Sequence, residues 1–122
     1  MRIAISSAGT DLTSQVDQRF GRCSYFLIVD VETNNFEVYP NSAASASNGA
    51  GIEAAKNLIK KGIKAVISGN IGPNAFQILQ AEGIEVVQEF KGTVNEAVKI
   101  FKEGNYSKAS SPNVNTHSGL RR

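Results

Sequence analysis

The sequence predicts a three-layer α/β/α domain built on a mixed five-stranded sheet. Three strand-like apolar runs come first, and a short turn joins the second and third, as in an antiparallel hairpin. Helical and strand-like segments then alternate, which is typical of a sheet covered by helices on both faces. The length of 122 residues suits one domain and allows an apolar core without disulfides.

The first half of the chain supplies three of the predicted strands. Residues 2–6 form a short apolar run, and residues 7–22 follow as a polar loop broken by glycines. Residues 25–31 (YFLIVDV) are apolar on both faces, as expected for a buried strand. Two asparagines at 34–35 tolerate the backbone of a tight turn, and residues 36–39 resume as the second strand of the hairpin.

The second half alternates helices and strands. The small polar residues 41–48 predict a loop, and a helical period begins at Gly51 and ends near Gly62. Residues 64–68 (KAVIS) then read as a strand. Together these segments predict a helix that crosses over to a parallel strand.

Two further helices complete the predicted domain. Pro73 suits the first position of the second helix, and residues 84–87 form the last strand. Thr93 and Glu96 have the spacing of a capping box, so the third helix starts there and ends at Gly104.

The resulting order is β-β-β-α-β-α-β-α. Right-handed crossovers favour a sheet order of 3-2-1-4-5 with the second strand antiparallel, a ribonuclease-H-like topology. A flavodoxin-like sheet would need a helix within residues 7–22, where the sequence offers none. We assign residues 1–104 to the domain and residues 105–122, rich in Ser and Asn, to a flexible C-terminal tail.

Composition excludes several classes of function. The net charge is only +2, so neither nucleic acid nor membrane is an expected partner. A single cysteine, Cys23, excludes an internal disulfide and a cluster held by four cysteines of one chain. The free thiol and the lack of a signal sequence predict a cytoplasmic protein.

The predicted topology brings the chemically distinctive segments to one side of the sheet. Ligands in open α/β sheets gather at the carboxyl ends of strands where the chain order reverses, here between the first and fourth strands. The end of the first strand, the start of the second and the two glycine-rich turns all reach this place. The candidate cofactor-binding residues are Arg19, Arg22, Cys23, Asn48, Gly49, Gly51, Ser68, Gly69, Asn70 and Gly72.

These residues suit a large anion with soft metal character. Helix N-termini offer unpaired N–H groups and partial positive charge, and glycine allows a ligand close approach. Arg19 and Arg22 add full positive charge, which we expect to lower the pKa of Cys23, the candidate metal ligand. Two plainer interpretations remain: the glycines are ordinary helix caps, and Cys23 is a small buried apolar residue.

Four segments resemble one known family. They are QRFGRCSYFLIVD from Gln18, GAGI from Gly49, ISGNIGPNA from Ile67 and GTV from Gly92. In this order they resemble the dinitrogenase iron–molybdenum cofactor biosynthesis family, which includes domains of the NifX and NifB C-terminal type. The family often has a histidine before its Phe-Gly-Arg stretch, where this chain has Arg19.

The resemblance implies a ribonuclease-H-like fold and a non-enzymatic role. It implies binding and carrying of an iron–sulfur or iron–molybdenum precursor cluster, with transfer between donor and acceptor proteins. One cysteine cannot complete the coordination of a cluster, so binding is expected to be labile or to use external thiols, a second subunit or His117. We expect a monomer or a weak homo-oligomer.

Three alternatives remain at this stage. A ribonuclease-H-like nuclease needs clustered carboxylates, but Asp11 and Asp17 lie in a loop and Asp30 lies at the far end of its strand. A phosphate- or nucleotide-binding module fits the glycine turns, although neither standard phosphate-loop pattern occurs. A plain interaction domain is the third.

Overall fold

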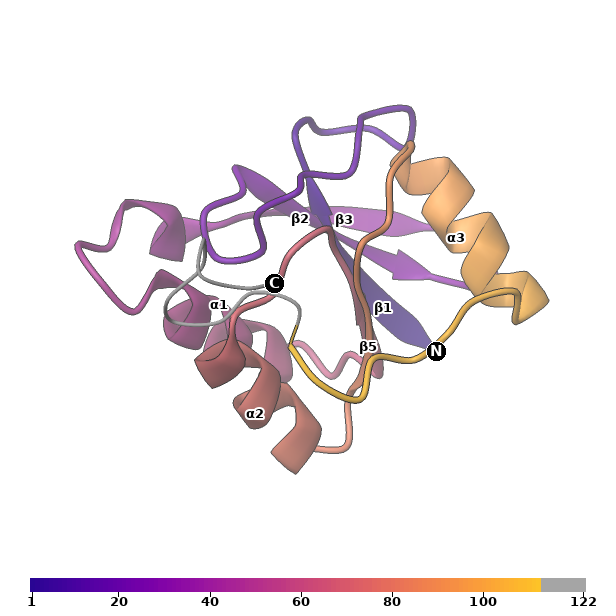
Figure 1. Cartoon of the computed structure of the whole chain (residues 1–122). Coiled ribbons are helices and arrows are strands. Elements are labelled where there is room, and N and C mark those ends of the chain that lie inside the picture. The colour runs from indigo at the N-terminus through magenta and orange to yellow at the C-terminus, as the bar shows by residue number, and fades with distance from the viewer. Residues whose placement is uncertain (113–122) are drawn as a thin grey trace.

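The computed structural model describes residues 1–112, which form one mixed sheet with helices on both faces (Figure 1). Its strands are β1 (Arg2–Ser7), β2 (Tyr25–Asp30), β3 (Phe36–Pro40), β4 (Ala65–Ile67) and β5 (Glu85–Val87). Its helices are α1 (Ala50–Ile59), α2 (Pro73–Ala81) and α3 (Val94–Glu103), and a short 3-10 helix, η1 (Ser42–Ser45), lies in a predicted loop. The predicted strands and helices are all present, with most ends shifted by about one residue and the end of α1 by about three.

The sheet has the predicted order β3-β2-β1-β4-β5. Strand β2 runs antiparallel to both β1 and β3, whereas β4 is parallel to β1 and to β5. The predicted topology is therefore confirmed. The chain order reverses between β1 and β4, and the loops that follow these two strands lie side by side.

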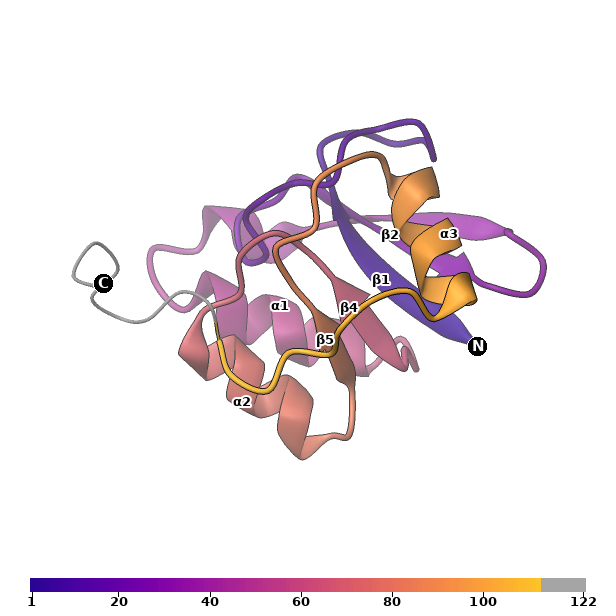
Figure 2. The ribbon, with the colours of Figure 1, turned by 45° about the vertical axis from the view of Figure 1, so that its right-hand side comes forward.

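The three layers follow from alternation along the central strands. Ala4, Ile28 and Val66 face one side and pack with Leu58 of α1 and Leu79 of α2. Their neighbours in sequence face the other side and pack against α3. Figures 1 and 2 show α1 and α2 together on one face and α3 alone on the other.

Local signals set several element boundaries as predicted. The Thr93 side chain accepts from the Glu96 amide, and the Glu96 carboxylate accepts from the Thr93 amide, which completes the capping box of α3. Asn34 adopts a positive φ of 63° in the hairpin turn, and Gly104 ends α3 with a φ of 70°. Most residues with a side chain are strained in this left-handed backbone conformation. Glycine and asparagine adopt it most readily.

Residues 105–112 differ from the predicted flexible tail. The Ala109 amide donates to the Val86 carbonyl oxygen at 2.8 Å, and the Tyr106 hydroxyl donates to the Glu85 carboxylate at 2.9 Å. This segment therefore lies along the outer edge of β5. Apolar periodicity could not predict this contact, because hydrogen bonds such as the main-chain bond of Ala109 hold the segment.

The rest of the predicted tail, with His117, lies outside the described residues. Within residues 1–112, the structure contains no helix that is long and apolar enough to cross a membrane.

Candidate functional site

A cleft of about 330 Å³ opens where α1 and α2 begin, beside the loop that precedes β2. It gathers four of the predicted site residues, Arg22, Gly49, Gly51 and Gly72, from three separate segments. The full lining is Phe20, Gly21, Arg22, Gly49, Ala50, Gly51, Ile52, Gly72, Pro73, Asn74 and Ala75.

Two helix N-termini face this cleft, and neither has a side-chain cap within residues 1–112. Helix α1 starts after Gly49, whose φ is 73°, and α2 starts after Gly72, with Pro73 in its first turn. The first amides of a helix have no partner in the helix itself, and they carry its partial positive charge. The cleft is therefore lined by groups of the kind that bind anions at other helix N-termini.

Gly21 allows this arrangement by its lack of a side chain. A Cβ atom at Gly21 would lie 2.7 Å from the Gly51 amide nitrogen, much closer than real Cβ atoms come to backbone. The loop before β2 thus touches the first turn of α1 directly. Sequence reasoning missed this residue, because the contact depends on two segments about thirty residues apart.

Arg22 supplies the cleft with a full positive charge. Its Nη1 donates to the carbonyl oxygens of Ala44 and Ala46, at 2.7 and 2.8 Å. These bonds fix the guanidinium at the cleft wall and also hold the end of η1. Arg22 remains exposed, so a ligand in the cleft can reach it.

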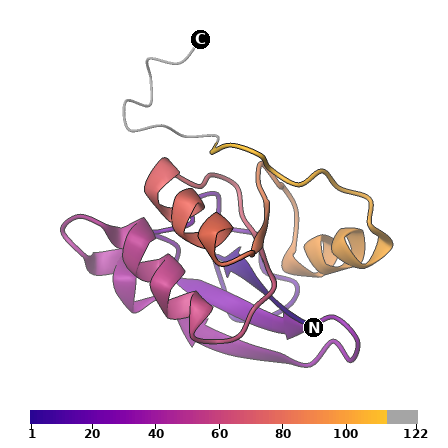
Figure 3. The same ribbon diagram turned by 90° about the horizontal axis from the view of Figure 1, so that it is seen from below.

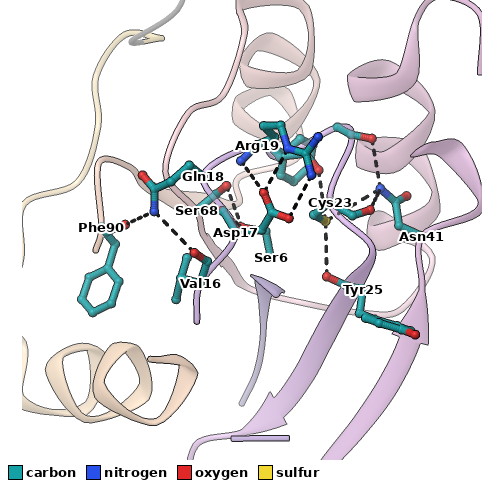
Figure 4. Close-up of polar contacts among 12 residues, drawn as sticks. Ser6, Val16, Asp17, Gln18, Arg19, Cys23, Tyr25, Asn41, Ser68 and Phe90 are labelled. Atoms are coloured by element: carbon teal, nitrogen blue, oxygen red, sulfur yellow. Dashed lines mark hydrogen bonds and ion pairs between the residues drawn. The ribbon is translucent and has the colours of Figure 1, made fainter. Parts of the chain in front are cut away.

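Arg19 lies outside the cleft lining. Its guanidinium pairs with the Asp17 carboxylate, Nε to Oδ1 at 3.3 Å, and this contact raises the pKa of Arg19 (Figure 4). A single parallel bridge joins Arg19 to Asn70, and the Asn70 amide donates to Gln18 at 2.7 Å. Arg19 and Asn70 therefore lie together, where they tie the loop before β2 to the loop after β4.

Ser68 and Gly69 are buried and support the loops from within. The Ser68 hydroxyl accepts from the Ser6 hydroxyl at 2.8 Å, and Ser6 belongs to the neighbouring strand β1. A Cβ atom at Gly69 would lie within 2.6 Å of the Gln18 Cα, so the two loops touch there. These two predicted residues hold the loops after β1 and β4 together and do not line the cleft.

Asn48 lines a different groove, on the outer side of α1. It shares that groove with Lys56 and Lys60, among others. The groove adjoins the cleft through Gly49 and Ile52, which line both.

Cys23 is fully buried, and the predicted lowering of its pKa is wrong. Its Sγ lies 3.2 Å from the Tyr25 carbonyl oxygen and 3.4 Å from that of Phe20 (Figure 4). Burial, helped by the negative charge of Asp17, raises the pKa of the thiol to about 12. The two arginines do not lower the pKa of the thiol, because Arg19 pairs with Asp17 and Arg22 donates to the carbonyl oxygens of Ala44 and Ala46.

Cys23 as a metal ligand remains a prediction. Ligation of a metal would require the thiol to lose its proton and the Cys23 side chain to move out of the core, where it packs in one cluster with Phe20. The structure agrees instead with the plainer expectation for a lone cysteine, a small buried residue at the start of a strand.

Asn41, which sequence reasoning overlooked, holds this region together. Its side-chain amide donates to the carbonyl oxygens of Gly21 and Cys23, at 3.0 and 2.9 Å, and lies 3.7 Å from the Cys23 sulfur. The signal available in the sequence is an asparagine directly after Pro40, at the end of the predicted strand. In the structure Asn41 is buried, and buried polar groups are normally hydrogen-bonded.

No group of three or more His, Cys, Asp or Glu side chains that could hold a metal ion occurs within residues 1–112. Metal-dependent cleavage of nucleic acid needs such a group of carboxylates. The described part of the chain therefore gives the nuclease alternative no support.

Fold and cleft together define a small α/β domain with an open cleft where two of its helices begin. The family model described as "Dinitrogenase iron-molybdenum cofactor" matches residues 1–104, and the chain belongs to this family. Membership supports a role in binding or assembling a cofactor of this type and confirms the resemblance seen in the sequence.

Known proteins of similar sequence and structure agree with this assignment. The apo form of the orange protein from Desulfovibrio gigas is 43% identical, with a TM-score of 0.89 over 92% of this chain and 95% of that one. An NMR structure of a candidate NifB protein from Thermotoga is 41% identical, with a TM-score of 0.76 over 88% and 91%. The uncharacterized protein MJ0580 of Methanocaldococcus jannaschii is 33% identical over 98 residues, 78% of this chain and 83% of the relative.

Proposed function

We propose that this chain binds an anionic iron–sulfur or iron–molybdenum precursor cluster as cargo and passes it between assembly proteins. The observation that carries the proposal is the cleft, where two uncapped helix N-termini and Arg22 converge. Family membership supplies the class of cargo, and the cleft supplies a means of holding it.

The donors in the cleft fit a cluster that brings its own ligands. Backbone amides and a guanidinium donate hydrogen bonds to sulfide or oxide, but they do not coordinate iron or molybdenum. The described residues offer no set of protein ligands that could replace those of the cluster. The cargo is therefore held by its surface and its negative charge.

This mode of binding suits transfer. A cluster that keeps its own ligands can leave without breaking bonds between metal and protein. The open cleft and the exposed Arg22 allow an acceptor protein to approach the cargo directly. Donor and acceptor proteins of cofactor assembly are the partners that this role requires.

The test is anaerobic titration with tetrathiomolybdate, a simple molybdenum–sulfide dianion, together with reconstitution using iron and sulfide. Arg22→Gln should weaken tetrathiomolybdate binding about tenfold or more, because it removes a charge-assisted donor. Lys99→Gln on α3 is the matched control: it removes the same charge from the opposite face of the sheet and should change binding less than about twofold. Equal affinities of the two variants, or a wild type that retains neither ligand, would contradict the proposal.

A phosphate- or nucleotide-type anion is the second candidate, because helix N-termini also hold phosphate. The buried, protonated Cys23 leaves the cleft without a soft donor and favours this alternative. Competition separates the two candidates. If inorganic phosphate displaces tetrathiomolybdate at similar concentration, the site is a general anion site and not a cluster site.

A further inference from the structure

The two outer strands of the sheet differ in how their free edges are covered. Residues 105–112 lie along β5, whereas no described segment lies beyond β3. The hairpin strands form the lower border of the molecule in Figure 3. Strand β3 also carries two of the few large apolar side chains that are exposed, Phe36 at 41% and Val38 at 36%. Uncovered edges of this kind are open to pairing with another strand.

The hydrogen bonds of the hairpin show which main-chain groups are available. The Asp30 amide donates to the Asn35 carbonyl oxygen, and the Asn41 amide donates to that of Ser24. Bonded pairs alternate along an antiparallel ladder, so odd-numbered residues of β3 point their main chain toward β2. The main-chain N–H and C=O groups of Phe36 and Val38 therefore point outward.

We propose that β3 pairs with β3 of a second copy of this chain, antiparallel and centred on Val38. The two Val38 residues would exchange main-chain bonds, and each Phe36 amide would donate to Pro40 of the other copy. Pro40 has no amide to offer, so four bonds form across the interface. On the α3 face, the Phe36 and Val38 side chains of both copies would make one apolar ridge.

Charge selects this register. It places Glu37 opposite Tyr39 of the second copy, and the Lys61 ammonium lies over the Tyr39 ring at 4.7 Å within each chain. Each Lys61 ammonium already pairs with the Glu37 carboxylate of its own chain, and its remaining donors would face Glu37 of the other copy. A register centred on Glu37 would set two carboxylates directly opposite, which is destabilising.

Pairing through β3 leaves the proposed cargo site free. The proposed dimer does not depend on the proposed function of that site. A two-fold axis reverses the strand direction between copies, so the two clefts would lie at opposite edges of a continuous sheet. A five-residue strand edge buries less surface than a standard stable interface. We therefore expect a reversible dimer that forms with increasing concentration.

Sedimentation of the full chain from about 10 μM to about 1 mM tests the pairing. The wild type should shift toward a dimer, and Val38→Lys should raise the dissociation constant about tenfold or more, because it places two ammonium groups at the centre of the interface. Gln77→Lys, an equal charge change at an exposed site on α2, should alter it less than about twofold. A wild type that remains monomeric, or a Val38→Lys variant that dimerises as the wild type does, overturns the proposal.

Cross-linking tests the register separately. Oxidation with diamide should join two Val38→Cys chains, because directly opposite residues have Cα atoms about 5.5 Å apart. Two Phe36→Cys chains should stay unlinked, since those positions would be about 13 Å apart. Efficient linking through Phe36→Cys but not Val38→Cys would rule out the proposed register.

Discussion

At the residue scale, burial decides the chemistry of the only cysteine. In the sequence Cys23 directly follows Arg22 and lies close to Arg19, which favoured a thiolate. In the fold both guanidinium groups have other partners, and the thiol points inward. Desolvation then dominates, because a charge in the interior loses the solvation that water provides. Side-chain direction at a strand start depends on tertiary packing and could not be predicted from sequence.

The raised pKa of Cys23 predicts a loss of stability in alkaline solution. The thiol of the folded chain has a pKa of about 12, above its unfolded value, so its contribution is present below about pH 8.5 and is lost as pH rises from there toward 12. At pH 10 the wild type should lose about 1–2 kcal/mol more than Cys23→Ala does, each relative to its own value at neutral pH. Urea denaturation at the two pH values measures this difference. Parallel pH profiles would show that the thiol ionises freely in the folded chain.

Gly21 is expected to tolerate no side chain. Gly21→Ala should destabilise the fold by about 1–3 kcal/mol and displace the start of α1, because its Cβ would meet the Gly51 backbone. Gly72→Ala is the control, since nothing lies within 4 Å of a Cβ there and its φ is −75°. Thermal denaturation of both variants measures the difference, and equal stabilities would mean that the contact with Gly51 is not tight.

At the element scale, periodic segments could be predicted and irregular ones could not. Apolar spacing, and caps such as the Thr93–Glu96 capping box, predict the strands and helices. The convergence of the two helix N-termini also followed from topology, because it depends on strand order alone. Residues 105–112 lack such spacing, and η1 is held by Asn41 and by the distant Arg22. Bonds of that kind are visible only in the folded chain.

The segment along β5 should add measurably to stability. Ala109→Pro removes the amide that donates to Val86 and should cost about 1–3 kcal/mol in the free energy of unfolding. Ala109→Ser keeps the amide at the same position and serves as the control. Urea denaturation compares the two, and a proline variant as stable as the serine variant would show that residues 105–112 do not hold to the sheet.

At the scale of the whole molecule, the proposed binding of an anion in the cleft relies on the position of its donors and not on net charge. The chain carries only +2 overall, so long-range attraction of an anion is weak. Affinity must come from short-range contacts with amides and with Arg22 inside the cleft. The family to which the chain belongs associates such a domain with the iron–molybdenum cofactor of dinitrogenase.

Salt should therefore weaken cargo binding only moderately. Exposed charges are screened beyond about 8–10 Å at physiological ionic strength, while contacts within hydrogen-bond distance persist. We expect tetrathiomolybdate affinity to fall less than about tenfold between 0.05 and about 0.5 M sodium chloride. Isothermal titration measures this directly. Complete loss of binding would indicate diffuse attraction to the surface in place of a defined cleft.

A cargo anion that sits at the two helix N-termini must perturb the amides there, and their chemical shifts report this perturbation. The uniformly ¹⁵N-labelled full chain, of 13.0 kDa, would be titrated with tetrathiomolybdate under anaerobic conditions. The largest shifts should fall on the amides of Ala50, Gly51, Asn74 and Ala75, where α1 and α2 begin. Shifts that spare these four amides and concentrate on another surface would show that the anion binds elsewhere.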